Sequence, residues 1–183
     1  CTNSPTHIFN MTASVETPRF ANTAARVIGS GWRLSGIFRA YSGVALTIAA
    51  GADRALTGMQ YQRASVSGND PYGSKAPDNW FNAAAFSQPA LGTHGNSGRN
   101  AYEGMGTRVV DLAVVRSFRF ATTQRLEARI EAFNAFNWFR PGEVNVNPTT
   151  NQAPVTNLSS PLFGRYLVAG DPRIMQFALK YSF

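Results

Sequence analysis

One short stretch of the sequence places four ionisable side chains at alternate positions. Arginine and glutamate follow each other at every second residue, in the order Arg125, Glu127, Arg129 and Glu131. In a helix, residues four apart are neighbours, so this order would pair like charges. In a β-strand all four side chains share one face. We therefore expect a strand with a polar face, which is either a solvated surface or the lining of a polar interior that contacts a ligand.

Other reactive residue types are too few or too scattered to suggest catalysis. Cys1 is the single cysteine, so it cannot form an internal disulfide, and His7 and His94 lie far apart in the sequence. The sequence contains no spacing typical of metal ligands and no pattern that pairs a nucleophile with a general base. We expect no catalytic residue, no metal and no cofactor, and we do not expect the protein to be an enzyme.

The net charge is +7 and the pI is about 10.2, which would suit a nucleic-acid-binding protein. The 17 lysines and arginines are spread along the chain, however, and form no cluster. We therefore expect no nucleic-acid partner. No stretch of about 18 apolar residues occurs, so the sequence predicts no transmembrane helix.

The last eleven residues, 173–183, alternate between apolar and mostly polar side chains. This pattern predicts a β-strand with one apolar face. It resembles the C-terminal assembly signal of outer-membrane β-barrels, in which a final aromatic residue follows apolar residues two, four and six positions upstream. The resemblance implies recognition by the barrel-assembly machinery. The residues that carry it are Phe177, Leu179, Tyr181 and Phe183.

The whole chain reads as an all-β protein, an antiparallel meander of about five long strands with long loops. The expected strands are 7–16, 32–42, 107–119, 125–137 and 173–183. The connections 43–106 and 138–172 are long, whereas the link 120–124 is short. In outer-membrane barrels the long loops are extracellular and the short turns periplasmic. Loop residues that could contact a ligand are Trp80, Phe81, His94 and Arg99.

One residue interrupts the expected apolar faces. Arg116 falls on the apolar side of the strand 107–119. A charge on a lipid-facing surface is tolerated near the membrane boundary but is costly at its centre. We therefore expect Arg116 to lie near a membrane surface.

The ordered motifs resemble the C-terminal barrel region of TonB-dependent outer-membrane receptors of the Oar-like type, which carry an N-terminal carboxypeptidase-regulatory-like domain. Each motif is short, but together they cover nearly the whole chain. They are Gly31–Ile37, Tyr41–Gly43, Asp53–Gly58, Trp80–Phe86, Gly92–Asn100, Asp111–Ala113, Arg125–Arg129, Glu131–Asn137, Phe163–Arg165 and Ala169–Arg173.

The resemblance implies a C-terminal fragment of a transmembrane barrel of about 22 strands, located in the bacterial outer membrane and in contact with its lipid. The plug and N-terminal domains would be absent from these residues, and so would the segment that contacts the TonB complex. The implied function is energy-coupled uptake of an unknown ligand. Two alternatives remain: a passive porin or surface adhesin built on a similar barrel, and a soluble β-sandwich binding module.

Overall fold

The computed structural model describes residues 5–120, 124–141 and 154–183. The chain forms two compact units, each built from segments far apart in the sequence. The strand unit comprises Phe9–Ala40, Arg108–Trp138 and Asp171–Phe183. The loop unit comprises Cys1–Ile8, Tyr41–Thr107 and Phe139–Gly170. The chain therefore alternates between the two units along its length.

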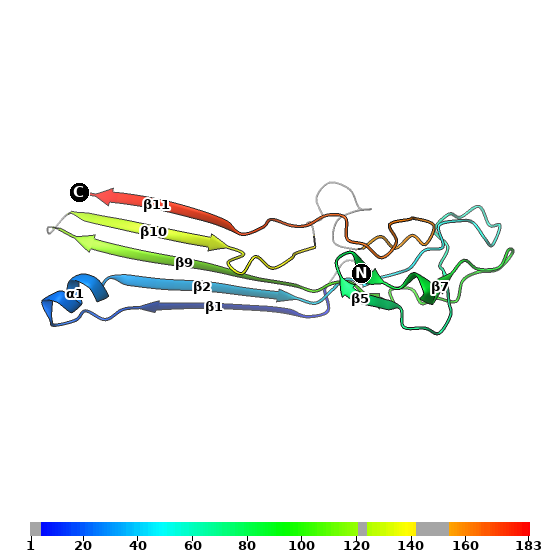
Figure 1. The fold of residues 1–183 in the computed structure, drawn as a ribbon, viewed down its shortest axis with the longest axis horizontal. Coiled ribbons are helices and arrows are strands. Elements are labelled where there is room, and N and C mark those ends of the chain that lie inside the picture. The colour runs from blue at the N-terminus through cyan, green and yellow to red at the C-terminus, as the bar shows by residue number, and fades with distance from the viewer. Residues whose placement is uncertain (1–4, 121–123, 142–153) are drawn as a thin grey trace. The chain divides into compact units, whose positions relative to one another are not determined.

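The strand unit is built around one five-stranded antiparallel sheet, in the order β1-β2-β9-β10-β11 (Figure 1). Each long strand pairs with the next long strand along the chain, so the sheet is a meander. One long connection, between β2 and β9, separates two of the neighbouring strands. The meander confirms the predicted fold class. The strands are β1 (Ile8–Glu16), β2 (Trp32–Tyr41), β9 (Thr107–Arg119), β10 (Arg125–Phe133) and β11 (Ile174–Ser182).

The register of the sheet keeps the apolar parities of neighbouring strands together. Ile130 of β10 lies opposite Val114 of β9 on one side and Phe177 of β11 on the other. The ring of Phe9 on β1 packs against that of Phe38 on β2, with centroids 5.9 Å apart. Because side chains in a strand alternate between faces, this register gives the sheet one apolar face and one polar face.

The strand β10 ends at Phe133, four residues before the end of the expected strand 125–137. Asn134 takes a left-handed conformation with φ of 49°, and its backbone N–H donates to Asp111 Oδ1 over 2.9 Å. Asparagine tolerates this conformation better than most residues. The Asn-rich motif after β10 is therefore a turn, and Asn137, also left-handed, accepts a hydrogen bond through Oδ1 from the N–H of Arg173 just before β11.

The connection between β1 and β2 contains a short helix that was not predicted, α1 (Thr23–Gly29). Asn22 caps it, since its Oδ1 accepts hydrogen bonds from the N–H groups of Ala24 and Ala25. At the start of β2, Gly31 has φ of +83°, and a side chain there would strike the carbonyl oxygen of Ser117. The described residues include no helix long and apolar enough to cross a membrane.

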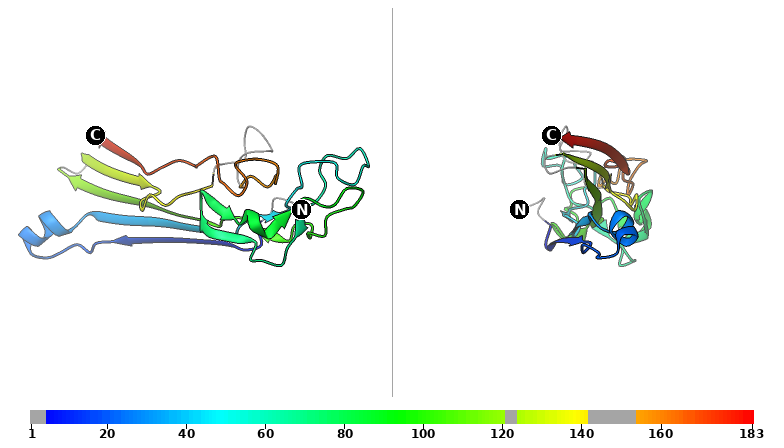
Figure 2. Two further views of the ribbon diagram at one scale, coloured as in Figure 1. Left: turned by 45° about the vertical axis from the view of Figure 1, so that its right-hand side comes forward. Right: turned by 90° about the vertical axis from the view of Figure 1, so that its left-hand side faces the viewer.

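The loop unit has a hydrophobic core of its own, which the prediction of a long loop over 43–106 did not include. Three two-stranded sheets pair segments that are up to about 60 residues apart. Its elements are β3 (Ala45–Leu46), β4 (Ser65–Val66), β5 (Tyr72–Ala76), β6 (Asn79–Phe81), η1 (Ala83–Ala85), β7 (Phe86–Ser87) and β8 (Tyr102–Glu103). Figure 2 shows these short strands (cyan to green) in two further views.

The expected connections fall partly outside the described residues. Residues 121–123 of the short link 120–124 and residues 142–153 of the connection 138–172 are not described. The described ends of the short link are joined by a hydrogen bond from the N–H of Phe120 to the carbonyl oxygen of Gln124, 3.2 Å long. This bond brings β9 and β10 together in a hairpin.

Candidate functional site

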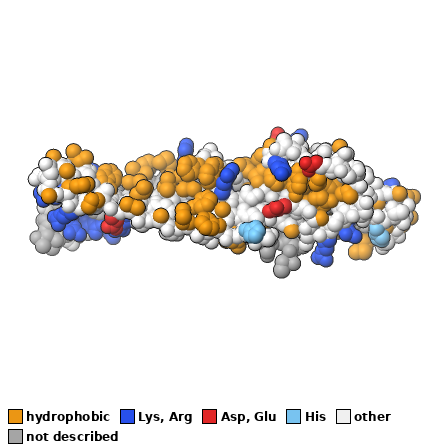
Figure 3. Space-filling model, turned by 90° about the horizontal axis from the view of Figure 1, so that it is seen from below, with side chains coloured by type: hydrophobic (Ala, Val, Ile, Leu, Met, Phe, Trp, Pro, Cys, Tyr) orange, Lys and Arg blue, Asp and Glu red, His pale blue; other side chains and the backbone are white. Residues whose placement is uncertain are grey.

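The apolar face of the sheet is exposed along its length. Its large hydrophobic side chains project from one side of a single layer, and Figure 3 shows hydrophobic side chains gathered along the strand unit. An exposed contiguous apolar surface of this kind marks contact with a partner or a membrane. The exposed members of this face are Phe9, Met11, Val15, Trp32, Leu34, Ile130, Met175, Phe177, Leu179 and Tyr181.

The polar face carries the predicted ladder on β10. Arg125 Nη2 lies 3.0 Å from Glu127 Oε2, and Arg129 Nη1 lies 3.3 Å from Glu131 Oε1. Arg125 also donates to Ser117 Oγ on β9 over 2.8 Å. The structure therefore brings the four predicted residues together as two ion pairs on one face.

The neighbouring strand β11 extends this polar face. Lys180 lies opposite Glu127 and Gln176 lies opposite Glu131. Opposite charges across neighbouring strands are mildly stabilising, by about 0.2–1 kcal/mol per pair. The face thus offers alternating cationic and anionic groups, which suits hydrogen bonding to a polar ligand or to water.

A second polar cluster on this face was not predicted. Arg39 Nη2 lies 2.5 Å from Asp111 Oδ2, and the other oxygen of Asp111 accepts from the N–H of Asn134. The side chain of Asn134 is buried and hydrogen-bonds both the N–H and the carbonyl oxygen of Trp138. Arg39 and Asp111 are 72 residues apart. Strand parity could show that each is polar-facing, but only the register brings them together.

Arg116 lies on the apolar face, as its parity predicts, opposite Ala128. Its guanidinium carbon lies 4.6 Å from the ring centroids of both Trp32 and Phe118. Its Nη2 donates to the carbonyl oxygen of Val27 in α1. Stacking on aromatic rings stabilises a guanidinium group, so the charge has local partners at the end of the sheet where α1 lies.

The C-terminal strand presents its predicted apolar residues outward. Phe177 is 70% exposed and Phe183 is 92% exposed. The rings of Tyr181 and Phe183 lie 6.0 Å apart. In the described chain, the only strand that pairs with β11 is β10, so β11 is an edge strand of the sheet.

Two of the predicted loop residues belong to the core of the loop unit. Phe81 is 2% exposed, and its ring packs against those of Tyr72, Phe86, Tyr102 and Phe163. A buried ring of this kind is placed for packing and not for contact with a ligand in solvent. Trp80 is partly buried beside this core, and its Nε1 donates to the carbonyl oxygen of Glu103 over 2.9 Å.

The other two predicted loop residues, His94 and Arg99, are exposed. The segment between them is anchored to the rest of the loop unit, because the N–H of Ser97 donates to the carbonyl oxygen of Ala64. These two side chains are therefore held at the surface of the loop unit. The predicted ligand contacts fall into two groups, one on the polar face of the strand unit and one on the loop unit.

A capped turn shapes another part of the loop unit. The carboxylate of Asp53 accepts hydrogen bonds from the N–H groups of Thr57 and Gly58 and from the side-chain amide of Gln62. Desolvation raises the pKa of Asp53, but these hydrogen bonds outweigh it and hold the pKa below its ordinary value. Asp53 thus has a structural role, and its oxygens are already used.

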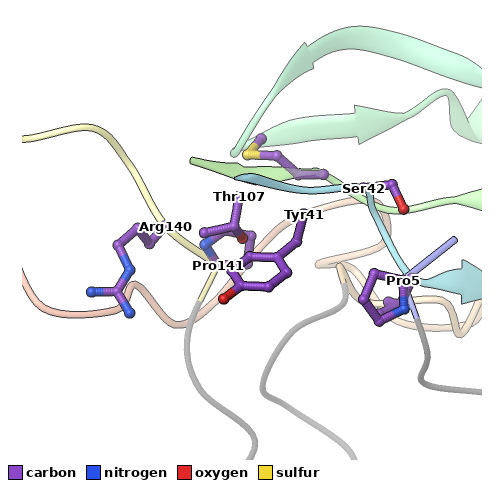
Figure 4. Close-up of a pocket in the computed structure, with 8 residues that line it drawn as sticks. Pro5, Tyr41, Ser42, Thr107, Arg140 and Pro141 are labelled. Atoms are coloured by element: carbon purple, nitrogen blue, oxygen red, sulfur yellow. The ribbon is translucent and has the colours of Figure 1, made fainter. Parts of the chain in front are cut away.

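The loop unit also contains a cavity of about 150 Å³. Figure 4 shows the ring of Tyr41 beside Pro141 at this cavity, with Arg140 and Ser42 on its border. Ser42 Oγ already accepts hydrogen bonds from the N–H groups of Thr6 and His7. Small-molecule sites are commonly about 300–1,000 Å³, so this cavity is too small for a whole ligand of ordinary size.

A metal site is not formed by the residues that the structure describes, since they contain no group of three or more histidine, cysteine, aspartate or glutamate side chains placed to hold an ion.

Comparison with known proteins gives one match. A family model described as an outer membrane β-barrel domain matches residues 1–176, which is nearly the whole chain. No curated protein and no solved structure matches the chain.

Proposed function

Because the chain belongs to the outer membrane β-barrel domain family, and is thus located in the bacterial outer membrane, we propose that its five long strands form part of the barrel wall of a TonB-dependent receptor. In this proposal the wall and its loops serve energy-coupled uptake of a ligand. The location excludes the alternative of a soluble β-sandwich module. It leaves open the passive porin and the surface adhesin.

The observation that carries the proposal is the contrast between the two faces of the sheet. One face is apolar and exposed, and the other carries ion pairs on β2, β9 and β10. Barrel strands in a membrane alternate in this way, with apolar residues toward lipid and polar residues toward the interior. The apolar face therefore contacts outer-membrane lipid and the polar face lines the lumen.

The ligand would meet two surfaces. The polar face offers Arg125, Glu127, Arg129 and Glu131, and the loop unit offers the exposed His94 and Arg99. The choice of a receptor over a porin is supported by the order of the sequence motifs that resemble TonB-dependent receptors. Contact with the TonB complex would be made by a part of the receptor outside these residues.

The experiment that tests the proposal uses the full-length protein in a planar lipid bilayer with KCl as the probe. A receptor with a plug shows no steady conductance, whereas a passive porin conducts continuously. The same protein, in detergent, is mixed with the purified periplasmic domain of TonB, and binding is measured by calorimetry.

A closed pore together with TonB binding supports the receptor. Steady conductance without TonB binding overturns the proposal in favour of a porin. A closed pore without TonB binding overturns it in favour of an adhesin.

We also propose that β11 is the strand that the barrel-assembly machinery recognises. Its exposed aromatic end supports this assignment. Replacing Phe183 with alanine should lower the amount of folded protein in the outer membrane several-fold, whereas replacing Ser182 on the polar parity should not. Equal amounts of folded protein for both variants would contradict the assignment. The measurement is heat-dependent mobility of the full-length protein on a gel.

A further inference from the structure

The position of Arg116 on the apolar face calls for a negative partner that the described residues do not supply. A cation on the lipid face is costly at the bilayer midplane and costs little near the interface. The structure gives an acceptor, the carbonyl oxygen of Val27, to one N–H of Arg116. The remaining donors of the guanidinium group have no acceptor within the described part of the chain.

The surroundings of Arg116 have the composition of a membrane boundary. Trp32 packs against its guanidinium group and donates through Nε1 to the carbonyl oxygen of Ile28, 2.8 Å away. Val27 and Ile28 of α1 are exposed, as is Phe120 just after β9. Tryptophan is enriched at membrane interfaces, where its ring is in apolar surroundings and its N–H is near polar groups.

The two links at this end of the sheet carry only cationic charged side chains, and Glu16, at the end of β1, is paired with Arg33. The segments 17–31 and 116–124 contain four arginines and no aspartate or glutamate. Arg19, Arg26 and Arg119 are exposed, and their guanidinium groups make no hydrogen bond or ion pair with any residue that the structure describes. Figure 3 shows Lys and Arg side chains gathered at the end of the strand unit that carries α1.

The topology indicates which leaflet this end faces. The link between β9 and β10 and the link between β1 and β2 are at this end, and both are shorter than the connections 42–106 and 134–173 at the other end. Short turns of outer-membrane barrels face the periplasm. The lipids at this end are therefore those of the inner leaflet, whose headgroups include phosphate.

We propose that Arg116, Trp32 and α1 form a binding site for the phosphate of an anionic glycerophospholipid in the inner leaflet. The phosphate accepts hydrogen bonds from Arg116, the acyl chains run along the apolar face, and Arg19, Arg26 and Arg119 attract the headgroup from the aqueous side. Juxtamembrane basic residues are attracted to membranes that contain anionic lipid. This inference rests on the apolar face lying in lipid and is independent of TonB-dependent uptake.

The test reconstitutes the full-length protein into nanodiscs of phosphatidylcholine with one quarter phosphatidylglycerol (about 25% anionic lipid) and measures the lipid retained after gentle detergent extraction by native mass spectrometry. The unmodified protein should retain phosphatidylglycerol in several-fold excess over its share of the bilayer. The excess should fall as NaCl is raised, because exposed charges are screened.

The informative variant is Arg116→Gln, and its matched control is Arg33→Gln. Arg33 lies on the polar face and pairs with Glu16 at 2.6 Å, so its removal changes the net charge equally without touching the proposed site. Arg116→Gln should abolish most of the excess, whereas Arg33→Gln should leave it unchanged. An equal loss in both variants would indicate general charge attraction and overturn the proposal.

Two further results keep the proposal testable if Arg116→Gln fails to fold. The double variant Arg26→Gln and Arg119→Gln alters exposed side chains only, and it should lower the phosphatidylglycerol excess. Unchanged retention in this variant overturns the cationic site. Preferential retention of lipopolysaccharide over phosphatidylglycerol, when both are offered to the unmodified protein, overturns the assignment to the inner leaflet.

Discussion

At the residue scale, the aromatic side chains of this protein divide into two groups with different roles. Those of the loop unit are buried and contact one another, with Phe81 at the centre of the core. Those of the strand unit mostly face outward, as Phe9 and Phe177 do. The same residue type therefore packs the core of one unit and forms part of the exposed apolar face of the other.

Truncating Phe81 should unfold the loop unit more easily. Phe81→Ala leaves a cavity among four aromatic rings, and such changes cost about 3–5 kcal/mol. The measurement is limited proteolysis of the full-length protein in detergent, with cleavage sites in 43–106 identified by mass spectrometry. Tyr61→Ala is the control, since Tyr61 is 88% exposed and its loss should change stability by less than about 0.5 kcal/mol. Equal protection of Phe81→Ala and the unmodified protein would show that this core is not required.

Alkaline pH should weaken the loop unit through Tyr166. Burial raises the pKa of its hydroxyl to about 12, although the hydroxyl accepts a hydrogen bond from the N–H of Met105. In the unfolded chain the hydroxyl loses its proton near pH 10. The contribution of Tyr166 to the free energy of unfolding should therefore be fully present below pH 10 and decrease by about 2–3 kcal/mol between pH 10 and pH 12.

The check is the pH dependence of denaturant-induced unfolding, followed by the fluorescence of Trp80 in a variant without the other tryptophans. Tyr166→Phe cannot ionise, so its stability should fall less steeply over the same pH range. Parallel curves for Tyr166 and Phe at this position would contradict the assignment, because other titrating groups are common to both proteins.

At the element scale, the two faces of β11 differ in their surroundings. Phe177 lies on the apolar face and Ala178 on the polar face, opposite Arg129. A charge that faces lipid near the bilayer centre is expensive, whereas a charge in a polar interior is solvated. The consequences of a substitution in this strand should therefore alternate from one residue to the next.

The pair Phe177→Arg and Ala178→Arg tests this alternation. Phe177→Arg should lower the free energy of unfolding in lipid vesicles by about 2–4 kcal/mol, and Ala178→Arg should lower it by less than about 1 kcal/mol. The measurement is urea titration of the full-length protein in phosphatidylcholine vesicles. Similar small changes for both variants would mean that both faces meet water, and the lipid contact of the apolar face would be refuted.

At the scale of the whole molecule, the order of the strands determines where the connections emerge. The segments 42–106 and 134–173 connect the strands at one end of the sheet, and the segments 17–31 and 120–124 connect them at the opposite end. The first pair holds nearly all of the loop unit. In a membrane, the two ends of the sheet therefore face opposite compartments.

Cysteine labelling in intact cells tests this topology. In a Cys1→Ser background, Tyr61→Cys should react with a membrane-impermeant maleimide in whole cells, because the longer connections of outer-membrane barrels are extracellular. Thr23→Cys, in α1 at the other end of the sheet, should react only after the outer membrane has been permeabilised. The reverse pattern would invert the topology and with it the leaflet assigned to Arg116.

Some of these features follow from strand periodicity and composition. The alternation in 125–133 and 173–183 defines two strands and assigns each side chain to a face, because a strand has a period of two whatever its partners. The same rule places Arg116 on the apolar face. The length of the connections already indicates an outer-membrane architecture, and the family match confirms the fold class and the location.

The tertiary structure decided what the connections contain and which distant groups meet. The end of β10 at Phe133 depends on the hydrogen bond from Asn134 to Asp111, and the pair Arg39–Asp111 depends on the register between β2 and β9. The burial of Phe81 depends on segments that converge from 44 to 163. The sequence determined the faces of the strands because periodicity is local. It could not determine these contacts, because pairing across tens of residues is selected only when the whole chain packs.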